Sequence, residues 1–117
     1  MHMPLATLES TDADLLREFR TGDQAAFAAL VRRHIDWVYW AARRQVHGDV
    51  HLAEDVAQAV FIVLAQRGKS LPDGVDLGPW LFGVTRFAAA NARRAEERRR
   101  KHETKAATMN TSLSKAN

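Results

Sequence analysis

The sequence predicts an all-α fold, a compact bundle of about four helices with a longer loop before the last helix. Two patterns carry this prediction. Apolar residues recur at three- and four-residue steps, which is the spacing of one helix face, and no segment alternates β-branched or aromatic residues with polar ones over the length of a strand. With 117 residues, of which 46% are hydrophobic, the chain suffices for one domain with a single modest core.

The first two helices are expected at residues 12–20 and 23–46, after a flexible leader at residues 1–11. Thr11 and Asp14 have the spacing of a capping box, in which each side chain accepts a hydrogen bond from a free backbone N–H at the helix start. A turn at residues 21–23 ends the first helix and caps the second. The second helix carries one apolar stripe, made up of Phe27, Leu30, Val31, His34, Val38, Tyr39 and Ala42.

The third helix is expected at residues 52–66, after a stop at residues 47–49. Its buried stripe is Val56, Val60, Val63 and Leu64, and Gly68 fits the position just past its end. The loop at residues 69–78 exceeds the usual helix–helix connection of ~2–8 residues, and long loops tend to carry function. Pro79 fits the first turn of a fourth helix, whose apolar face holds Trp80, Leu81, Val84, Ala88 and Ala92. Residues 104–117 are polar, and we expect them to be disordered.

The composition of the chain excludes several classes of protein. The chain contains no cysteine, which excludes disulfides and thiolate metal sites. No apolar run reaches the ~18 residues of a membrane span, and the N-terminus lacks the features of a secretory signal, so we expect a cytoplasmic protein without membrane contact. Residues 1–85 carry a net charge of −3 and residues 86–117 a net charge of +6. This asymmetry suggests a polyanionic partner such as nucleic acid.

No catalytic motif is present. The sequence lacks a nucleophile elbow, a glycine-rich phosphate loop and a helical zinc-binding motif, so we expect neither enzyme activity nor a cofactor. His47, His51 and Glu54 could be drawn as metal ligands. However, Gly48 interrupts the helix between the two histidines and no fourth ligand is evident, so capping and solvated polar residues are the better interpretation.

The segment at residues 53–61 indicates a docking face. Val56 and Val60 face the core, whereas four other side chains fall away from that stripe: Glu54, Asp55, Gln58 and Phe61. An exposed aromatic ring framed by acids and an amide suits a partner helix with basic residues. The alternative is a solvated helix with Phe61 tucked against a neighbour, and spacing alone favours this alternative slightly.

The fourth helix and the loop before it suggest a nucleic-acid interface. The candidate side chains are Lys69, Arg86, Asn91, Arg93, Arg94 and Arg98. Arginine makes bidentate phosphate contacts, and arginine and asparagine suit base edges. The alternative is a charged solvent face on which Glu96 and Glu97 pair with residues 100 and 101. We favour nucleic-acid binding. For Trp80, core packing is preferred over base stacking, and we expect Trp37 or Trp40 to be partly exposed.

The order of several short motifs resembles a known family. The motifs are residues 25–30, Arg33-His34, Val38-Tyr39, residues 53–61, and Trp80-Leu81 leading into the arginine-rich helix. Together they make residues 14–103, about three quarters of the chain, similar to region 2 of a bacterial RNA polymerase sigma factor of the extracytoplasmic-function (ECF) group. The resemblance implies one helical domain at residues 12–103, followed at residues 104–117 by the start of an interdomain linker.

The resemblance also implies partners. The helix with Asp55, Gln58 and Phe61 would dock on the clamp helices of the largest catalytic subunit of bacterial core RNA polymerase. The loop and the fourth helix would engage the non-template strand of the promoter −10 element and help to melt it, with a flipped base held by the loop. An anti-sigma factor is a further expected partner. Many relatives have an acid at the position of Ala59, and Asn and Asp at the positions of Phe87 and Asn91.

The chain is shorter than a complete relative. A complete relative has a second helical domain that reads the −35 element, and this chain ends where the linker to it should begin, so we expect an excised domain or a truncated product.

The resemblance leaves two rival interpretations. The first rival is a helical interaction domain without DNA binding, which self-associates as a homodimer through exposed apolar surface. The second rival is a basic nucleic-acid-binding helix whose likeness to sigma factors is accidental.

Overall fold

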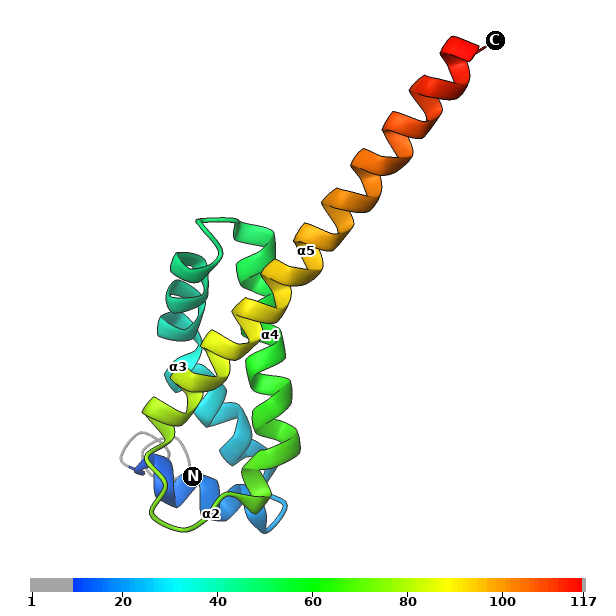
Figure 1. The fold of residues 1–117 in the computed structure, drawn as a ribbon. Helices are drawn as coiled ribbons and strands as arrows, with labels where there is room; N and C mark the ends of the chain where they lie inside the picture. Colours follow the sequence, from blue (N-terminus) through cyan, green and yellow to red (C-terminus); the bar gives the residue numbers. More distant parts are fainter. Residues whose placement is uncertain (1–9, 117) are drawn as a thin grey trace.

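Four α-helices and one 3₁₀ turn make up the computed structural model, which describes residues 10–116 (Figure 1). The helices are α2 (Asp12–Arg20), α3 (Gln24–Gln45), α4 (Val50–Arg67) and α5 (Leu77–Ala116), and η1 (Gly68–Ser70) follows α4 directly. The described residues contain no strand, which confirms the all-α prediction. Most of the predicted leader lies outside the described residues. No helix of the described residues combines the length and apolar character needed to cross a membrane.

Side-chain caps fix the starts of the first three helices. Thr11 and Asp14 form the predicted capping box, with the Asp14 N–H donating to Thr11 Oγ1 at 3.1 Å and the Thr11 N–H donating to Asp14 Oδ2 at 3.2 Å. Asp23 accepts from the N–H of Ala25 at 2.9 Å, and Asp49 caps α4 in the same manner. These caps satisfy N–H groups that have no partner inside their helices.

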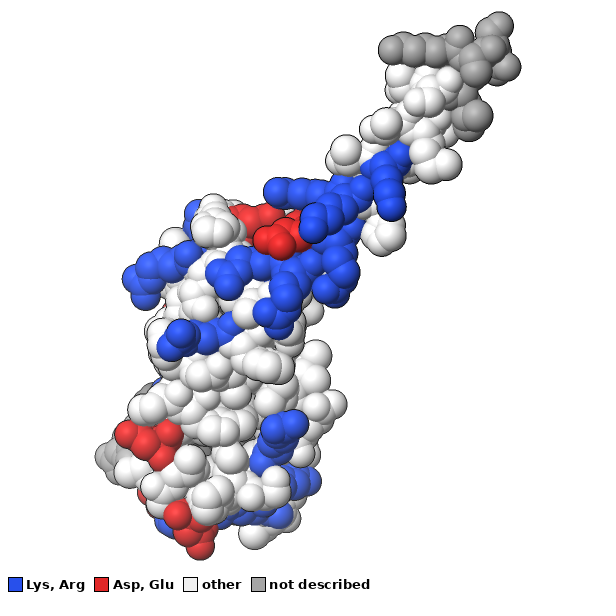
Figure 2. Space-filling view, in the orientation of Figure 1, with Lys and Arg blue, Asp and Glu red and all other residues white. Residues whose placement is uncertain are grey.

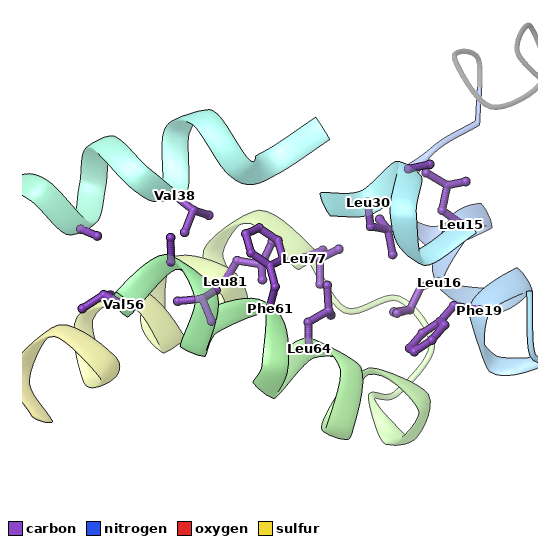
Figure 3. Packing of buried hydrophobic residues seen from close by; sticks show 14 of the residues in the cluster. Leu15, Leu16, Phe19, Leu30, Val38, Val56, Phe61, Leu64, Leu77 and Leu81 are labelled. Atoms are coloured by element: carbon purple, nitrogen blue, oxygen red, sulfur yellow. The ribbon is translucent and has the colours of Figure 1, made fainter. Parts of the chain in front are cut away.

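The core lies where the four helices meet (Figure 3). Each helix contributes large buried side chains: Leu15, Leu16 and Phe19 from α2, Leu30 and Val38 from α3, Val56, Val60 and Leu64 from α4, and Leu77 and Leu81 from α5. Burying such a side chain stabilises the fold by ~1.5–3 kcal/mol. The bundle is therefore held by one shared cluster to which every helix contributes.

The buried stripe of α5 is shifted by one position from the predicted one and shares only Leu81 with it. Its innermost positions are Leu77, Leu81, Thr85 and Ala89, each four residues after the last. Thr85 is tolerated there because its hydroxyl donates to the Leu81 carbonyl at 2.8 Å. The predicted Trp80, Val84, Ala88 and Ala92 lie at the edge of the stripe and pack against the core while half-buried. Core packing of Trp80 is thereby confirmed. On α4, Val63 is half-buried, not buried as predicted.

Gly68 lies just past the end of α4, as predicted, but not in the backbone conformation typical of a glycine at that position. Its backbone is right-handed, with φ −56°, so it does not end α4 in a left-handed conformation. A Cβ atom at this position would lie 3.2 Å from Phe19 and 3.3 Å from Leu64. Glycine thus lets the chain pass close to the core as it enters η1. Because α5 begins at Leu77, the loop itself is shorter than predicted and spans residues 71–76.

A part-buried polar network around His34 joins α2 to α3. Trp37 Nε1 donates to His34 Nδ1 at 2.8 Å, and His34 Nε2 lies 3.0 Å from Asp12 Oδ2. An indole N–H can only donate, so Nδ1 of His34 accepts and the proton of the neutral ring sits on Nε2, facing Asp12. Arg33 donates to the other oxygen of Asp12 at 3.0 Å. His34 therefore serves as a polar link inside an otherwise apolar stripe.

The second half of α5 projects beyond the bundle (Figure 1). We predicted disorder from residue 104, whereas the structure continues α5 as one helix of 40 residues to Ala116. Alanine and lysine in residues 104–116 favour helix, whereas the threonines, serines and asparagine there favour it less, and the Thr111 hydroxyl donates to the Ala107 carbonyl at 2.9 Å. Polarity here marks a solvated helix and not the absence of one.

Candidate functional site

A groove between α3 and α4 carries negative charge. We call it the acidic groove; it has a volume of about 330 Å³ and is lined by Ile35, Asp36, Tyr39, Glu54, Ala57 and Gln58. Asp55 lies next to Glu54 and is also exposed. Three of the four docking residues predicted on α4, namely Glu54, Asp55 and Gln58, thus share the solvent-facing side of this helix. The contribution of α3 was missed, because sequence spacing alone does not show which helices lie side by side.

Phe61 is not exposed, which contradicts its place on the docking face and confirms the alternative in which it is tucked against its neighbours. Phe61 is only 8% exposed and lies among the core side chains (Figure 3). The buried stripe of α4 is wide enough to include both Val60 and its neighbour Phe61. Ile62, by contrast, is 56% exposed and lies seven residues after Asp55, on the same face of the helix. The exposed apolar side chain of this face is therefore Ile62, and the seven-residue spacing from Asp55 was the signal that could have found it.

A second groove, between α3 and α5, carries positive charge. We call it the basic groove; it has a volume of about 750 Å³ and is lined by Ala41, Arg44, Gln45, Phe82, Gly83, Arg86, Phe87, Ala90 and Arg93. None of these side chains is acidic. Phe87 is 69% exposed, and Phe82 is exposed as well. The groove thus combines guanidinium groups with solvent-accessible aromatic rings, and sequence reasoning had identified neither phenylalanine nor Arg44 as part of it.

The predicted DNA-binding residues fall into different environments. Arg86 is exposed in the basic groove and makes no ion pair among the described residues. Arg93 is half-buried, and its Nη1 donates to the Gln45 carbonyl at 2.7 Å, where α3 ends. Arg94 donates to the side-chain oxygen of Asn91, and both are exposed. Arg93 therefore binds the backbone of α3, whereas the exposed Arg86 and Arg94 make no such contact among the described residues.

Like Asn91 and Arg94, the two remaining predicted DNA-binding residues do not line the basic groove. Arg98 is exposed on the projecting part of α5 and has no ion pair among the described residues. Lys69 belongs to η1, where its ammonium group lies 5.2 Å from the centre of the Phe19 ring. Figure 2 shows lysine and arginine side chains gathered where α5 leaves the bundle, with few acidic side chains among them.

Ion pairs form on the side of α5 that faces away from Arg98, in the part of the helix that projects beyond the bundle. Arg99 binds Glu96 and Glu103, the latter at 2.6 Å, and Arg100 lies 3.5 Å from Glu96. The hydrogen bond from Arg99 holds the pKa of Glu96 below its ordinary value. Pairing of Glu96 with Arg100 was predicted, whereas the two contacts of Arg99 were not. These glutamates neutralise Arg99 and Arg100 and leave Arg94 and Arg98 available to other partners.

One of the two tryptophans of α3 was predicted to be partly exposed. Trp40 is 55% exposed, with the guanidinium of Arg43 5.0 Å from its ring centre, and Trp37 is half-buried, which confirms that one of the two is accessible.

His51 and Glu54, two of the three side chains considered as metal ligands, lie close together. His51 Nδ1 lies 3.7 Å from Glu54 Oε1 on the exposed side of α4. In the described part of the chain, no three potential ligand side chains come together to hold a metal ion.

Comparisons with known proteins identify the family. Residues 30–99 match the family model for sigma-70 region 2. The chain is 39% identical over 88 residues to a protein named RNA polymerase sigma factor CarQ, from Myxococcus xanthus. That similarity covers 74% of this chain and 47% of the relative, so the chain spans about half the length of the relative. No solved structure matches it. The chain therefore belongs to the sigma-70 region 2 family, a non-enzymatic family of transcription initiation whose members in general bind core RNA polymerase and promoter DNA.

Proposed function

We propose that this domain uses its two grooves for two different partners during transcription initiation. The acidic groove docks on the clamp helices of the largest catalytic subunit of bacterial core RNA polymerase. The basic groove holds the non-template strand of the promoter −10 element and helps to melt it. The observation that carries the proposal is the separation of charge on α3: Ile35, Asp36 and Tyr39 line the acidic groove, whereas Ala41, Arg44 and Gln45 line the basic groove.

The acidic groove suits a basic helix. Carboxylates of Asp36, Glu54 and Asp55 stand exposed around an apolar floor formed by Ile35 and Tyr39. A partner helix with arginine or lysine would place its charges against the carboxylates and its apolar side chains on the floor. Such charge complementarity favours the correct partner and speeds association more than it adds affinity.

The basic groove suits a single strand. Aromatic rings stack on unpaired bases with ~1–3 kcal/mol per base, and arginines bind the phosphates between them. The rings of Phe82 and Phe87 are exposed beside Arg44 and Arg86, as such binding requires. Phe87, which departs from the usual asparagine of relatives, adds a stacking surface here. Extruding a base from a duplex costs a few kcal/mol, which stacking and phosphate contacts can offset.

The test compares two triple variants, each of which serves as the control for the other. The docking variant combines Asp55→Ala, Gln58→Ala and Ile62→Ala; Phe61 stays in place because it packs in the core. The strand variant combines Arg44→Ala, Arg86→Ala and Phe87→Ala. We expect the docking variant to lose at least about tenfold in affinity for core polymerase while it keeps its affinity for single-stranded −10 DNA, and the strand variant to show the reverse.

Two outcomes would count against the proposal, once circular dichroism shows that each variant is as helical as the parent. Unchanged polymerase affinity in the docking variant would remove the acidic groove from the docking face. Loss of both partners in both variants would show that the grooves do not act separately.

Self-association is the second candidate, and one observation favours it. Ile35 and Ile62 are both exposed on the side of the bundle that carries the acidic groove. A second copy could cover these side chains. Sedimentation equilibrium of the parent and of Ile62→Ala distinguishes the two: concentration-dependent dimers that Ile62→Ala abolishes would support self-association, and a monomer at all concentrations would eliminate it.

A further inference from the structure

One face of α5 carries a basic stripe that no other part of the described fold covers. Its side chains are all exposed and follow one another at steps of three or four residues, which places them on one side of the helix: Arg94, Arg98, Lys101 and Lys105. None of them forms an ion pair among the described residues. Met109, four residues after Lys105, adds an exposed apolar side chain to this face. The stripe is therefore free to meet another molecule.

The acidic groove between α3 and α4 has the complementary character. The carboxylates of Asp36 and Glu54 line it from its two walls, and Ile35 and Tyr39 supply apolar surface. The only charged contact of either carboxylate among the described residues is that of Glu54 with the exposed ring of His51, at 3.7 Å. The groove thus suits a lysine or arginine whose aliphatic stem packs on the apolar floor while its charged end reaches a carboxylate.

The basic stripe and the acidic groove agree in spacing. Lys101 and Lys105 are one turn apart, which is about 6 Å along the helix axis. The lining residues of α3 fall within one turn, from Ile35 to Tyr39, and so do those of α4, from Glu54 to Gln58. One turn of the stripe therefore matches one turn of each wall.

The apolar side chains extend this agreement by a further turn. Met109 follows Lys105 by four residues, and Ile62, which is 56% exposed, follows Gln58 by four. A helix whose two lysines face the groove would bring Met109 to the level of Ile62. The flexible thioether side chain of methionine adapts to such a surface. Charge and apolar contact are thus arranged in the same order on the two surfaces.

The stripe cannot reach the groove of its own chain. α5 is one unbroken helix from Leu77 to Ala116, and its second half leads away from the bundle (Figure 1). To bring residues 98–109 back to α3 and α4, this helix would have to break. A helix that covers the groove must come from another molecule, and a second copy of this chain offers one of opposite charge.

We propose that the projecting half of α5 from one copy docks in the acidic groove of a second copy. The proposal rests on self-association, the second candidate function, and gives it a defined contact in which Lys101 and Lys105 meet Asp36 and Glu54. Because this groove is also the proposed docking face for core polymerase, a second copy and polymerase compete for it. Salt should weaken the contact, since exposed charges are screened.

The test exchanges the charges and follows the association of the full chain by sedimentation equilibrium at low salt. The groove variant combines Asp36→Lys and Glu54→Lys, and the helix variant combines Lys101→Glu and Lys105→Glu. We expect the parent to self-associate and each variant alone to associate at least about tenfold more weakly, because its groove and its helix then carry charge of the same sign. An equimolar mixture of the two variants should regain the association of the parent, since each groove again meets a helix of opposite sign.

The matched control reverses two arginines of the basic groove, Arg44→Glu and Arg86→Glu. Both side chains are exposed, and the net charge changes by as much as in the helix variant. This control should associate as the parent does, once circular dichroism shows that all variants are equally helical. Equal weakening in the control would show that net charge governs the association, and it would overturn the contact between α5 and the acidic groove.

The remaining outcomes separate this contact from self-association in general. A parent that is monomeric at every concentration would overturn both, and it would leave the proposed binding of polymerase and DNA as it is. Variants that associate as strongly as the parent, or a mixture that stays monomeric, would overturn only the docking of α5. Self-association through Ile35 and Ile62 would then remain, and Ile62→Ala tests it.

Binding to core polymerase tests the competition. At a concentration where most of the parent is self-associated, the helix variant has a free groove and should bind polymerase at least about threefold more tightly than the parent. Dilution to a concentration where the parent is monomeric should remove this difference. Equal affinities at both concentrations, with the parent associated, would overturn the competition. Absence of polymerase binding in both proteins would instead contradict the proposed docking function.

Discussion

The two halves of α5 have the same secondary structure but differ in what holds it. In residues 77–93, a stripe of side chains at four-residue intervals is buried against α3 and α4. In residues 97–112, every side chain is exposed, and the helix relies on its own residues: ion pairs among Glu96, Arg99, Arg100 and Glu103, and intrinsic helix propensity. Isolated helices are marginal in water, so the projecting half should respond to conditions that leave the packed half unchanged.

The largest effect is expected from the packed half. Leu81→Ala removes a fully buried side chain from the core and should lower the free energy of unfolding by ~2–5 kcal/mol. Met109→Ala removes an apolar side chain of the projecting half that is exposed, and it should leave the free energy of unfolding unchanged within about 0.5 kcal/mol. Urea titrations followed by tryptophan fluorescence measure both. A large loss in Met109→Ala would mean that the projecting half is packed in solution, and the contrast between the halves would fail.

The same contrast explains which features of the structure can be predicted from the sequence. Helices, caps and most of the core were predictable, because three- and four-residue spacing and capping residues act within one segment. The burial of Phe61 was predicted only as the slightly favoured of two alternatives, since whether a stripe includes both residues 60 and 61 depends on how many helices surround α4. Helix beyond residue 104 was not predicted, because good and poor helix formers are mixed there and no apolar face is present to reveal the helix.

The candidate site was less predictable than the fold. Each groove is formed by two helices, and the second helix could not be assigned from spacing within the first. Ile35 and Tyr39 of α3 complete the acidic groove, and Arg44 of the same helix completes the basic one. Arg93 has a further contact that spacing could not reveal: it lines the basic groove and also donates to the Gln45 carbonyl, at the end of α3.

An intermediate effect is expected where the two halves meet. Arg93→Ala breaks the hydrogen bond to the Gln45 carbonyl, which is part-buried, and should lower the free energy of unfolding by ~1–3 kcal/mol. Arg98→Ala, five residues further along α5, should not change stability but should weaken DNA binding and reduce its salt dependence by about one phosphate contact. Thermal unfolding and DNA titrations at several salt concentrations separate the two roles. Equal loss of stability in both variants would show that the packed half extends past residue 93.

The smallest effect is a loss of helix in the projecting half on acidification. Its cause is Glu96, whose pKa lies below the ordinary value of 4.5 because Arg99 donates a hydrogen bond to the carboxylate. A lowered pKa means that the stabilising contribution is fully present above pH 4.5 and is lost as the pH falls through the lower value of the folded state. Circular dichroism at 222 nm should therefore show a small decrease below pH 4.5, ahead of the unfolding of the core.

Glu96→Gln supplies the comparison for this effect. The amide cannot ionise, so this variant should have the lower helix content already at neutral pH and should lose less of it on acidification. A parent and a Glu96→Gln variant with the same pH profile would show that the ion pairs do not stabilise the projecting half. Helix propensity alone would then account for the second half of α5, and the packed half would differ from it only by burial.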